Sequence, residues 1–133
     1  MSVALLIITH DRIGDQLLHT ATTMLGVCPL NAATIAVHGD GDPDVILKEA
    51  EPTMARLDEG DGVLILTDAY GSTPSNIAIR LLDAHQAMVI AGVNLPMLIR
   101  VLNYPRLSLE ELAQKALSGG RDGVLLCRED PWS

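Results

Sequence analysis

Short aliphatic runs alternate along the chain with longer segments in which apolar residues recur at helical spacing. The runs are continuously apolar, whereas a strand with one face in water shows alternating polar positions. This pattern predicts an α/β protein whose parallel sheet is covered by helices on both faces. The predicted strands are residues 3–9, 34–37, 62–67, 87–93 and 123–127, and the predicted helices are residues 13–25, 43–57, 74–84, 96–102 and 109–117. Pro52 interrupts the second helix, which we expect to be bent or split.

Residues at the ends of several predicted helices match capping patterns. Asp42 and Thr73 each stand before a proline, and Ser108 stands before "LEEL". Each of the three offers a side-chain oxygen to the first turn of a helix. Gly26 and Gly119 stand where helices are predicted to end. These signals support the alternation of strands and helices.

Composition limits the classes of function. A chain of 133 residues fits a single domain, 1–133, and its core must be aliphatic because Phe is absent. Nine basic against 17 acidic residues give a formal net charge of −8. This charge disfavours nucleic acid and anionic membranes as partners, and it suits a protein partner with a basic patch.

Neither a signal peptide nor a transmembrane helix is expected. The start of the chain lacks the basic, apolar and small-residue order of a signal peptide, and no apolar run reaches the roughly 18 residues of a spanning helix. We therefore expect a cytoplasmic protein without membrane insertion. Cys28 and Cys127 are far apart and form no CxxC pair, which favours buried reduced thiols over a disulfide or a metal site.

Two predicted strands end on residues that carry chemistry. His10 follows the first strand and Asp68 follows the third, and the carboxyl ends of parallel strands meet at one edge of a sheet. A carboxylate bound to one imidazole nitrogen fixes the tautomer and leaves the lone pair of the other nitrogen free. The sequence therefore predicts that Asp68 orients His10 as a nucleophile.

The segment after Asp68 indicates the electrophile. Gly71 allows a close approach of the backbone, Ser72 and Thr73 supply hydroxyls, and the helix that follows directs unpaired amides outward. Together they form a cradle for an anion, and a phosphoryl group fits it. Such a transfer needs an aligned nucleophile and donors for the equatorial oxygens, so neither cofactor nor metal is expected.

Three segments, "IITHD", "GVLILTDAYGSTPSN" and "AGVNLPMLIR", resemble in order and spacing the mannose-type enzyme IIA domain of the bacterial phosphoenolpyruvate-dependent phosphotransferase system. The resemblance implies that His10 accepts a phosphoryl group from the histidine-containing phosphocarrier protein and passes it to a IIB component. It also implies a flavodoxin-like doubly wound sheet, for which residues 123–127 are a candidate antiparallel edge strand, and a homodimer. By position, Asp68 matches the residue that bonds the active histidine.

The resemblance extends to other residues of the site and has two departures. Ser72 and Thr73 match the phosphate-binding turn, and Asn94 lies in a loop that borders the same edge. The family usually has Gly where this chain has Asp11 and Ser72. Asp11 places a negative charge beside the acceptor, so the rate or the choice of partner can differ. A chain with these changes serves either sugar uptake or a regulatory phosphotransfer chain without a permease.

Several other polar residues have two interpretations. Tyr70 is either a rim contact for a partner or a packing residue, and Arg80 and Arg100 are either salt-bridged or docking contacts. His19 and His85 fall on helical segments and are expected at the surface or in packing. The loop "HGDGDPD" offers possible metal ligands, but its spacing is not that of an EF-hand, and a solvated turn with a helix cap explains it.

Two other classes of function are possible on the predicted fold. A receiver-like signalling domain would carry the phosphoryl group on Asp68, but it needs an acidic pair for Mg²⁺ and a Lys near the last strands. Asp11 has no acidic neighbour, and Lys48 and Lys115 lie in predicted helices. A flavin-binding module is the other possibility, for which Tyr70 alone could stack on the ring.

Overall fold

The computed structural model describes residues 2–83 and 86–128. The strands are β1 (Ala4–His10), β2 (Ala32–Val37), β3 (Val63–Thr67) and β4 (Ala87–Ala91). The helices are α1 (Ile13–Leu25), α2 (Pro43–Leu57), α3 (Thr73–Arg80), α4 (Leu95–Leu102) and α5 (Leu109–Asp122), with a short 3₁₀ turn at Leu81–Asp83. Each of these strands and α helices was predicted from the sequence to within a few residues. The prediction that the helix starting at residue 74 reaches residue 84 lies partly outside the described residues.

The described strands form one parallel sheet in the order β2-β1-β3-β4. This is the order of a doubly wound, flavodoxin-like sheet, as predicted. The two central strands, β1 and β3, are continuously buried up to their last residues, and they pair with Ile8 opposite Thr67. The ends of these two strands therefore meet at the middle of the carboxyl edge.

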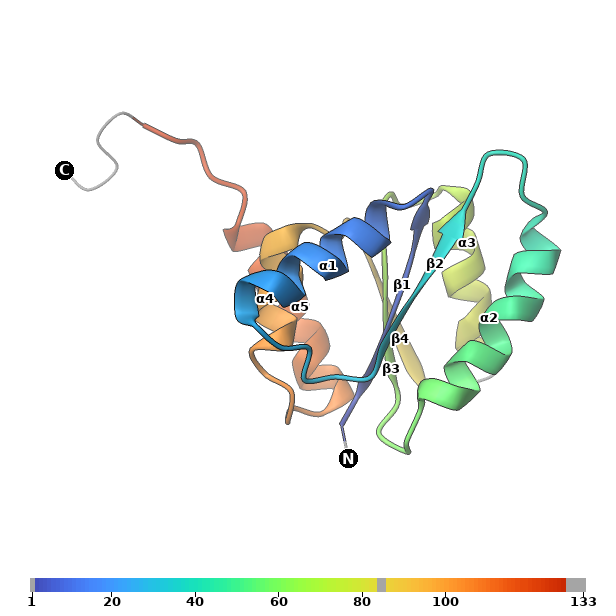
Figure 1. Cartoon of the computed structure of the whole chain (residues 1–133), viewed down its shortest axis with the longest axis horizontal. Helices are drawn as coiled ribbons and strands as arrows, with labels where there is room; N and C mark the ends of the chain where they lie inside the picture. The colour runs from blue at the N-terminus through green and yellow to red at the C-terminus, as the bar shows by residue number, and fades with distance from the viewer. Residues whose placement is uncertain (1, 84–85, 129–133) are drawn as a thin grey trace.

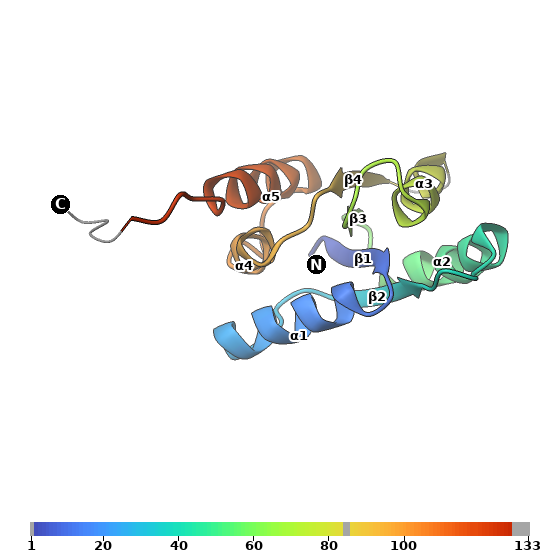
Figure 2. The ribbon, with the colours of Figure 1, turned by 90° about the horizontal axis from the view of Figure 1, so that it is seen from above.

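Two aliphatic cores lie on opposite faces of the sheet. Alternate residues of β1 face opposite sides, so that Leu5 and Ile7 join one core while Leu6 and Ile8 join the other. Helices α1, α4 and α5 cover the first face, and α2 and α3 cover the second (Figures 1 and 2). Burial on both faces explains why the central strands read as unbroken apolar runs.

The prediction of a strand at residues 123–127 is wrong. Helix α5 continues to Asp122, and the residues after it are extended but pair with no strand in the described part of the chain. Val124, Leu125 and Leu126 are 75%, 76% and 88% exposed. Figure 1 shows this segment leading away from the helices and the sheet. An apolar run alone cannot distinguish an exposed extended segment from a buried strand.

Two predicted helix ends also differ from the structure. Gly119 lies inside α5, where a Cβ atom would be 2.6 Å from Cβ of Arg100, so this glycine allows α5 to pack closely on α4. Ser72, and not Thr73, occupies the N-cap position of α3, and its side chain makes no capping bond among the described residues. The left-handed C-cap at Gly26 is confirmed.

The remaining caps follow the predictions, Pro52 does not split its helix, and one cysteine is exposed where a buried thiol was expected. Asp42 accepts a hydrogen bond from the amide of Asp44, and Ser108 forms a full capping box with Glu111. Helix α2 runs through Pro52 without being split. Cys28 is half-buried, whereas Cys127 is exposed, and both thiols are free.

None of the helices in residues 2–83 and 86–128 has the length and apolar composition needed to cross a membrane.

Candidate functional site

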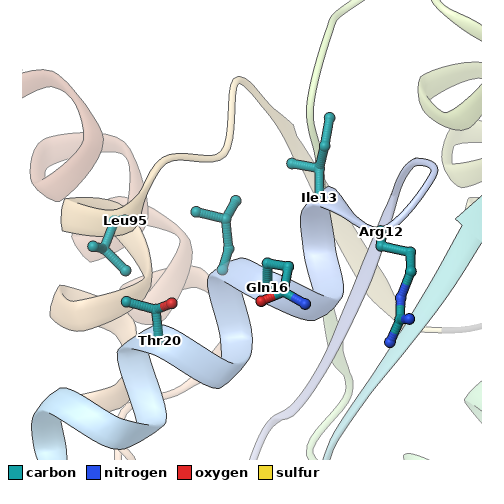
Figure 3. A pocket seen from close by; sticks show the side chains of 6 residues that line it. Arg12, Ile13, Gln16, Thr20 and Leu95 are labelled. Atoms are coloured by element: carbon teal, nitrogen blue, oxygen red, sulfur yellow. The ribbon is translucent and has the colours of Figure 1, made fainter.

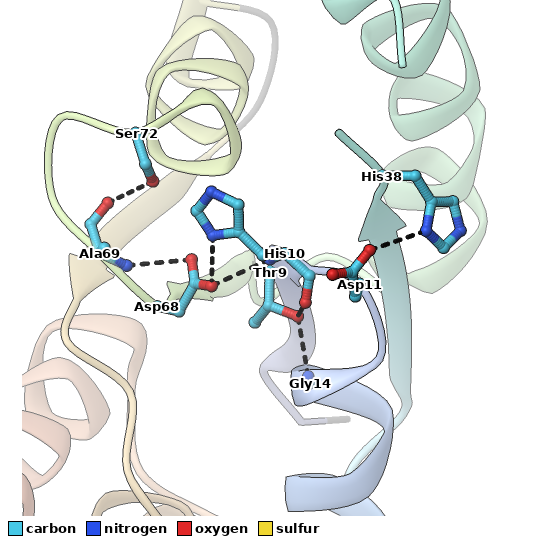
Figure 4. A network of polar contacts seen from close by, with 8 residues as sticks. All are labelled: Thr9, His10, Asp11, Gly14, His38, Asp68, Ala69 and Ser72. Carbon is cyan, nitrogen blue, oxygen red and sulfur yellow. Dashed lines mark hydrogen bonds and ion pairs between the residues drawn. The ribbon is translucent and has the colours of Figure 1, made fainter. Parts of the chain in front are cut away.

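His10 and Asp68 lie together at the carboxyl edge of the sheet. The ring Nδ1 of His10 lies 2.7 Å from Asp68 Oδ2, and the backbone amide of His10 donates to the same oxygen at 2.9 Å (Figure 4). The His10 side chain is 46% exposed and that of Asp68 is 13% exposed. A carboxylate that faces Nδ1 favours the tautomer with its proton there. The lone pair of Nε2 is then available to an incoming electrophile.

Asp68 is held in its ionised form by hydrogen bonds. Burial by itself raises its pKa, but donation from the amide and ring of His10 and from the Ala69 amide lowers the pKa below the ordinary value of 3.8. A depressed pKa means that ionised Asp68 stabilises the fold above its unfolded-state pKa, and that this stabilisation is lost as the pH falls through the folded-state pKa. Near neutral pH, Asp68 is therefore a fixed acceptor for the ring of His10.

The loop between β3 and α3 carries the predicted anion-binding residues. Gly71 has a φ of +83°, a left-handed conformation that favours glycine, and open space where a side chain would begin. Ser72 Oγ donates to the carbonyl oxygen of Ala69 at 2.5 Å, and the Ser72 amide donates to the same oxygen at 3.2 Å. These contacts give the loop a defined shape.

The start of α3 lies at the same edge as His10. Thr73 is exposed at the first position of the helix, and the first amides of a helix have no partner within it. Figure 4 shows the ring of His10 directed from Asp68 toward the loop that carries Ser72. The arrangement can therefore align a nucleophile on one side of a phosphoryl group and backbone donors on the other.

Comparisons with known proteins show the family to which the chain belongs. A family model described as the PTS system fructose IIA component, EIIA-man, matches residues 4–117. The chain belongs to the mannose-type IIA family of the phosphotransferase system. It is 35% identical over 136 residues to the mannose-specific EIIAB component of Escherichia coli (strain K12), a match that covers 98% of this chain and 41% of that protein. The chain thus spans less than half of the length of this relative.

Other relatives of the IIA family are also similar. The fructose-specific EIIA component of Bacillus subtilis (strain 168) is 35% identical over 75 residues, which cover 55% of this chain and 51% of that one. The mannose/sorbose specific IIA subunit from Enterococcus faecalis has the same fold, with a TM-score of 0.86 at 23% identity over 96% of each chain. The EIIA component from Streptococcus agalactiae aligns with a TM-score of 0.81 at 19% identity.

Asp11, where the resemblance implies a glycine, has a left-handed backbone with a φ of +45°. Its amide donates to the carbonyl of Val37 at 3.0 Å, so the turn after β1 is tied to the end of β2. Its carboxylate points toward His38, whose Nδ1 lies 3.0 Å from Oδ1 (Figure 4). The charge of Asp11 is thus engaged by a second histidine. Its effect on rate or partner choice stays a prediction.

An apolar pocket adjoins the His10–Asp68 site on the side of α1. Its volume is about 480 Å³, and it is lined by Arg12, Ile13, Gln16, Leu17, Thr20 and Leu95 (Figure 3). The lining begins two residues after His10 and runs along α1 to the start of α4. Ile13 is 46% exposed there. The edge that carries His10 is therefore continuous with an exposed apolar surface.

Tyr70 and Asn94 differ in how they are held. Tyr70 is 85% exposed, so it does not pack in the core of this chain. Asn94 caps α4 by accepting from the amide of Met97 at 2.9 Å, and its Nδ2 donates to the carbonyl of Gly120 at 3.1 Å. Both ends of the Asn94 amide are therefore occupied by structural bonds, whereas Tyr70 is free to contact a partner.

Two other singled-out side chains, Arg80 and Arg100, bond residues other than His10 and Asp68. Arg80 pairs with Asp44 at 3.0 Å, and Arg100 donates to Ser118 at 3.2 Å. His19 is exposed on α1, and His85 lies outside the described residues. Within residues 2–83 and 86–128, no group of three or more His, Cys, Asp and Glu side chains is placed to hold a metal ion.

Sequence reasoning assigned no role in phosphotransfer to two residues of the site region, Thr9 and His38. Thr9 is buried directly before His10, and its hydroxyl accepts from the amide of Gly14 at 2.8 Å. His38 follows β2 and bonds Asp11. A histidine directly after a predicted strand was a usable signal for His38, because β2 lies beside β1. No sequence signal marked the bond of Thr9.

Proposed function

We propose that this chain carries a phosphoryl group on Nε2 of His10, which it receives from the histidine-containing phosphocarrier protein and passes to a IIB component. The observation that carries the proposal is the 2.7 Å contact between His10 Nδ1 and Asp68 Oδ2, which leaves the other ring nitrogen free. Membership of the IIA family supports the phosphocarrier protein as the donor. The E. coli relative, whose name joins the A and B components, supports the acceptor.

In the proposed transfer the protein supplies the nucleophile and groups that stabilise charge. The lone pair of His10 Nε2 forms a new N–P bond while the N–P bond of the carrier breaks, and the imidazole of the carrier leaves with that electron pair. Positive charge grows on the His10 ring and is stabilised by Asp68. The helix start after Ser72 faces the charge on the equatorial oxygens. In the second transfer His10 is the leaving group, and none of these steps needs a cofactor.

Surface properties support protein partners for both transfers. His10 is half-exposed, and the apolar pocket along α1 begins two residues away from it. The net charge of −8 favours a partner with a basic surface. We propose that residues 1–133 act as one IIA domain in the cytoplasm, where phosphoenolpyruvate is available. The phosphoryl group then serves sugar uptake through IIB, or the phosphorylated chain acts in regulation.

Phosphorylation with a defined chemical stability tests the proposal. The chain is incubated with labelled phosphoenolpyruvate, enzyme I and the phosphocarrier protein, and the label is then followed at low and at high pH. A phosphoramidate on imidazole is hydrolysed in acid, where the ring is protonated and leaves readily, but it survives in alkali. We expect label that is lost in acid and kept in alkali.

Two results would contradict this expectation. Label lost in alkali, or Mg²⁺-dependent labelling from acetyl phosphate, would indicate an acyl phosphate on Asp68 and a receiver-like domain. No label under any of these conditions would make the chain a binding or regulatory module. An absorbance spectrum of the purified protein tests the flavin alternative separately, because a bound flavin absorbs visible light.

We also propose that the chain forms a homodimer through the segment after α5. Val124, Leu125 and Leu126 are all more than 70% exposed, and three adjacent apolar side chains in water are costly for a monomer. Strand β4 forms one edge of the described sheet, and an open strand edge can accept an extended segment from another chain. These observations support exchange of the segment between two copies.

Sedimentation velocity at tens of micromolar tests the homodimer. We expect the wild type to sediment as a dimer and the double variant Leu125→Ser/Leu126→Ser to shift to monomer. Val45→Ser is the matched control, because Val45 is 52% exposed on α2, away from this segment. A monomeric wild type, or a double variant that stays dimeric, would contradict the proposed interface.

A further inference from the structure

The hydroxyl of Thr9 lies at the base of the turn that presents His10. Thr9 is 1% exposed, and its Oγ1 accepts from the amide of Gly14 at 2.8 Å. The same hydroxyl donates to the carbonyl of His10 at 3.2 Å. Thr9 is thus bonded to the backbone on both sides of the turn between β1 and α1, as Figure 4 shows. A buried hydroxyl with two backbone partners fixes the positions of both.

This bond replaces the ordinary cap of α1. The N-cap residue of that helix is Arg12, whose side chain makes no capping bond among the described residues. Gly14 lies in the first turn, and its amide is one of the donors that a helix leaves unpaired. The bond from Gly14 to Thr9 satisfies that donor from the strand itself. The start of α1 is therefore anchored to the end of β1, one residue before His10.

Close packing makes the anchor rigid. A Cβ atom added at Gly14 would lie 2.9 Å from Cγ2 of Ile7 and 3.2 Å from Oγ1 of Thr9, so the helix start lies directly against the strand. The turn between them also contains the left-handed backbone of Asp11. A non-glycine residue in that conformation persists only where the surroundings hold it. Loss of the Thr9 hydroxyl would remove its bonds to both sides of this turn.

We propose that Thr9 is a positioning residue for His10, which acts by fixing the turn that aims the imidazole at the incoming phosphorus. The inference rests on the proposed phosphotransfer at His10. Small displacements of a nucleophile from its line of attack lower the rate of transfer strongly, whereas they change the binding of the partner little. Loss of the Thr9 hydroxyl should therefore lower the rate of phosphoryl transfer within the complex with the phosphocarrier, and not the affinity for that carrier.

The chain offers a matched control at the neighbouring strand. Thr67 ends β3 directly before Asp68, as Thr9 precedes His10, and it is 0% exposed. Its Oγ1 has no hydrogen-bond partner in the part of the chain that the structure describes. Thr67→Val thus removes a buried hydroxyl of the same kind from the same edge without removing a bond. It should leave the transfer rate within about twofold of wild type.

Rapid-quench transfer from the phosphorylated phosphocarrier tests the proposal. In Thr9→Val we expect the saturating rate to fall about tenfold, with an unchanged half-saturating carrier concentration. Thr9→Ser, which keeps the hydroxyl, should recover the rate to within about twofold of wild type. Thr9→Ala is measured in parallel, since it removes the hydroxyl without placing a methyl group against the Gly14 amide. Equal saturating rates in Thr9→Ala and Thr67→Val would overturn the proposal.

A second measurement separates this proposal from the phosphotransfer itself. Hydrogen exchange of the Gly14 amide and the ring ¹⁵N signals of His10 are recorded on the unphosphorylated protein. In Thr9→Val we expect faster exchange at Gly14 and a changed or broadened His10 ring signal, and neither change in Thr67→Val. If the wild type takes no label, the phosphotransfer fails while these spectra still test Thr9. Unchanged spectra in Thr9→Val would then overturn the positioning role.

Discussion

His10→Ala is expected to abolish phosphorylation by the phosphocarrier while the fold stays intact. The proposed N–P bond forms at Nε2 of the imidazole, and the alanine side chain has no nucleophilic atom. His10 is the last residue of β1, and its side chain is 46% exposed, so its removal leaves no cavity in the core. Incorporation of label and the thermal unfolding midpoint, measured on the same preparation, check both parts of this expectation.

His38→Ala is the matched control for this variant. His38 also lies at the end of a strand of the sheet, and its Nδ1 also faces a carboxylate, Asp11 Oδ1, at 3.0 Å. It is more exposed than His10, with 63% of its side chain accessible. A histidine paired with a carboxylate is thus present in both places, but the predicted anion-binding loop, residues 69–72, lies beside His10. Label retained by His10→Ala and lost from His38→Ala would place the acceptor at His38 and refute our assignment.

The pairing of His10 with Asp68 could be predicted from two general properties of parallel sheets. Continuous apolar runs identify β1 and β3 as buried parallel strands, and residues at the carboxyl ends of such strands gather at one edge. The sequence also showed that Gly71 and the helix start follow Asp68 directly. A site composed of strand ends and the next turn needs little knowledge of distant contacts.

The rest of the site depends on contacts that spacing does not show. Asp11 bonds His38 because β2 lies beside β1, and Gly119 packs on Arg100 because α5 lies against α4. The sequence marks a histidine after the second strand, but local patterns show neither that Asp11 contacts it nor that α5 packs on α4. The apolar residues after Asp122 have the composition of a buried strand but lie in solvent in this chain. The apolar composition of this segment is compatible with a buried strand, but whether it is buried depends on the surface against which it packs.

Asp68→Asn is expected to slow phosphorylation of His10 by one or more orders of magnitude. The substitution keeps the shape of the side chain, but the amide is neutral and can offer its nitrogen to the ring in place of an oxygen. The His10 ring then loses the acceptor that selects its tautomer, and the positive charge that grows during attack loses its counter-charge. Replacement of a carboxylate that orients a catalytic histidine has effects of this size or larger in other enzymes.

Asp11→Asn is the matched control, because Asp11 also bonds a histidine at this edge but is exposed and faces His38. We expect its transfer rate to stay within about threefold of wild type, since exposed ion pairs contribute little. Single-turnover transfer at saturating carrier compares the two variants. A rate for Asp68→Asn within about twofold of wild type, or equal losses in both variants, would show that Asp68 does not orient His10.

Stability against pH gives an independent measure of the same carboxylate. Burial raises the pKa of Asp68, but hydrogen bonds from His10 and Ala69 together outweigh it, so the pKa is lowered in the folded chain. Ionised Asp68 therefore stabilises the wild type above its unfolded-state pKa, and the stabilisation disappears as the pH falls through the lower, folded-state pKa. The amide of the Asp68→Asn variant cannot ionise, so the free energy of unfolding of the wild type should exceed that of the variant by more at about pH 7 than at about pH 2. Urea unfolding at a series of pH values measures this difference, and a difference that is independent of pH would show that the hydrogen bonds to Asp68 do not favour its charged form.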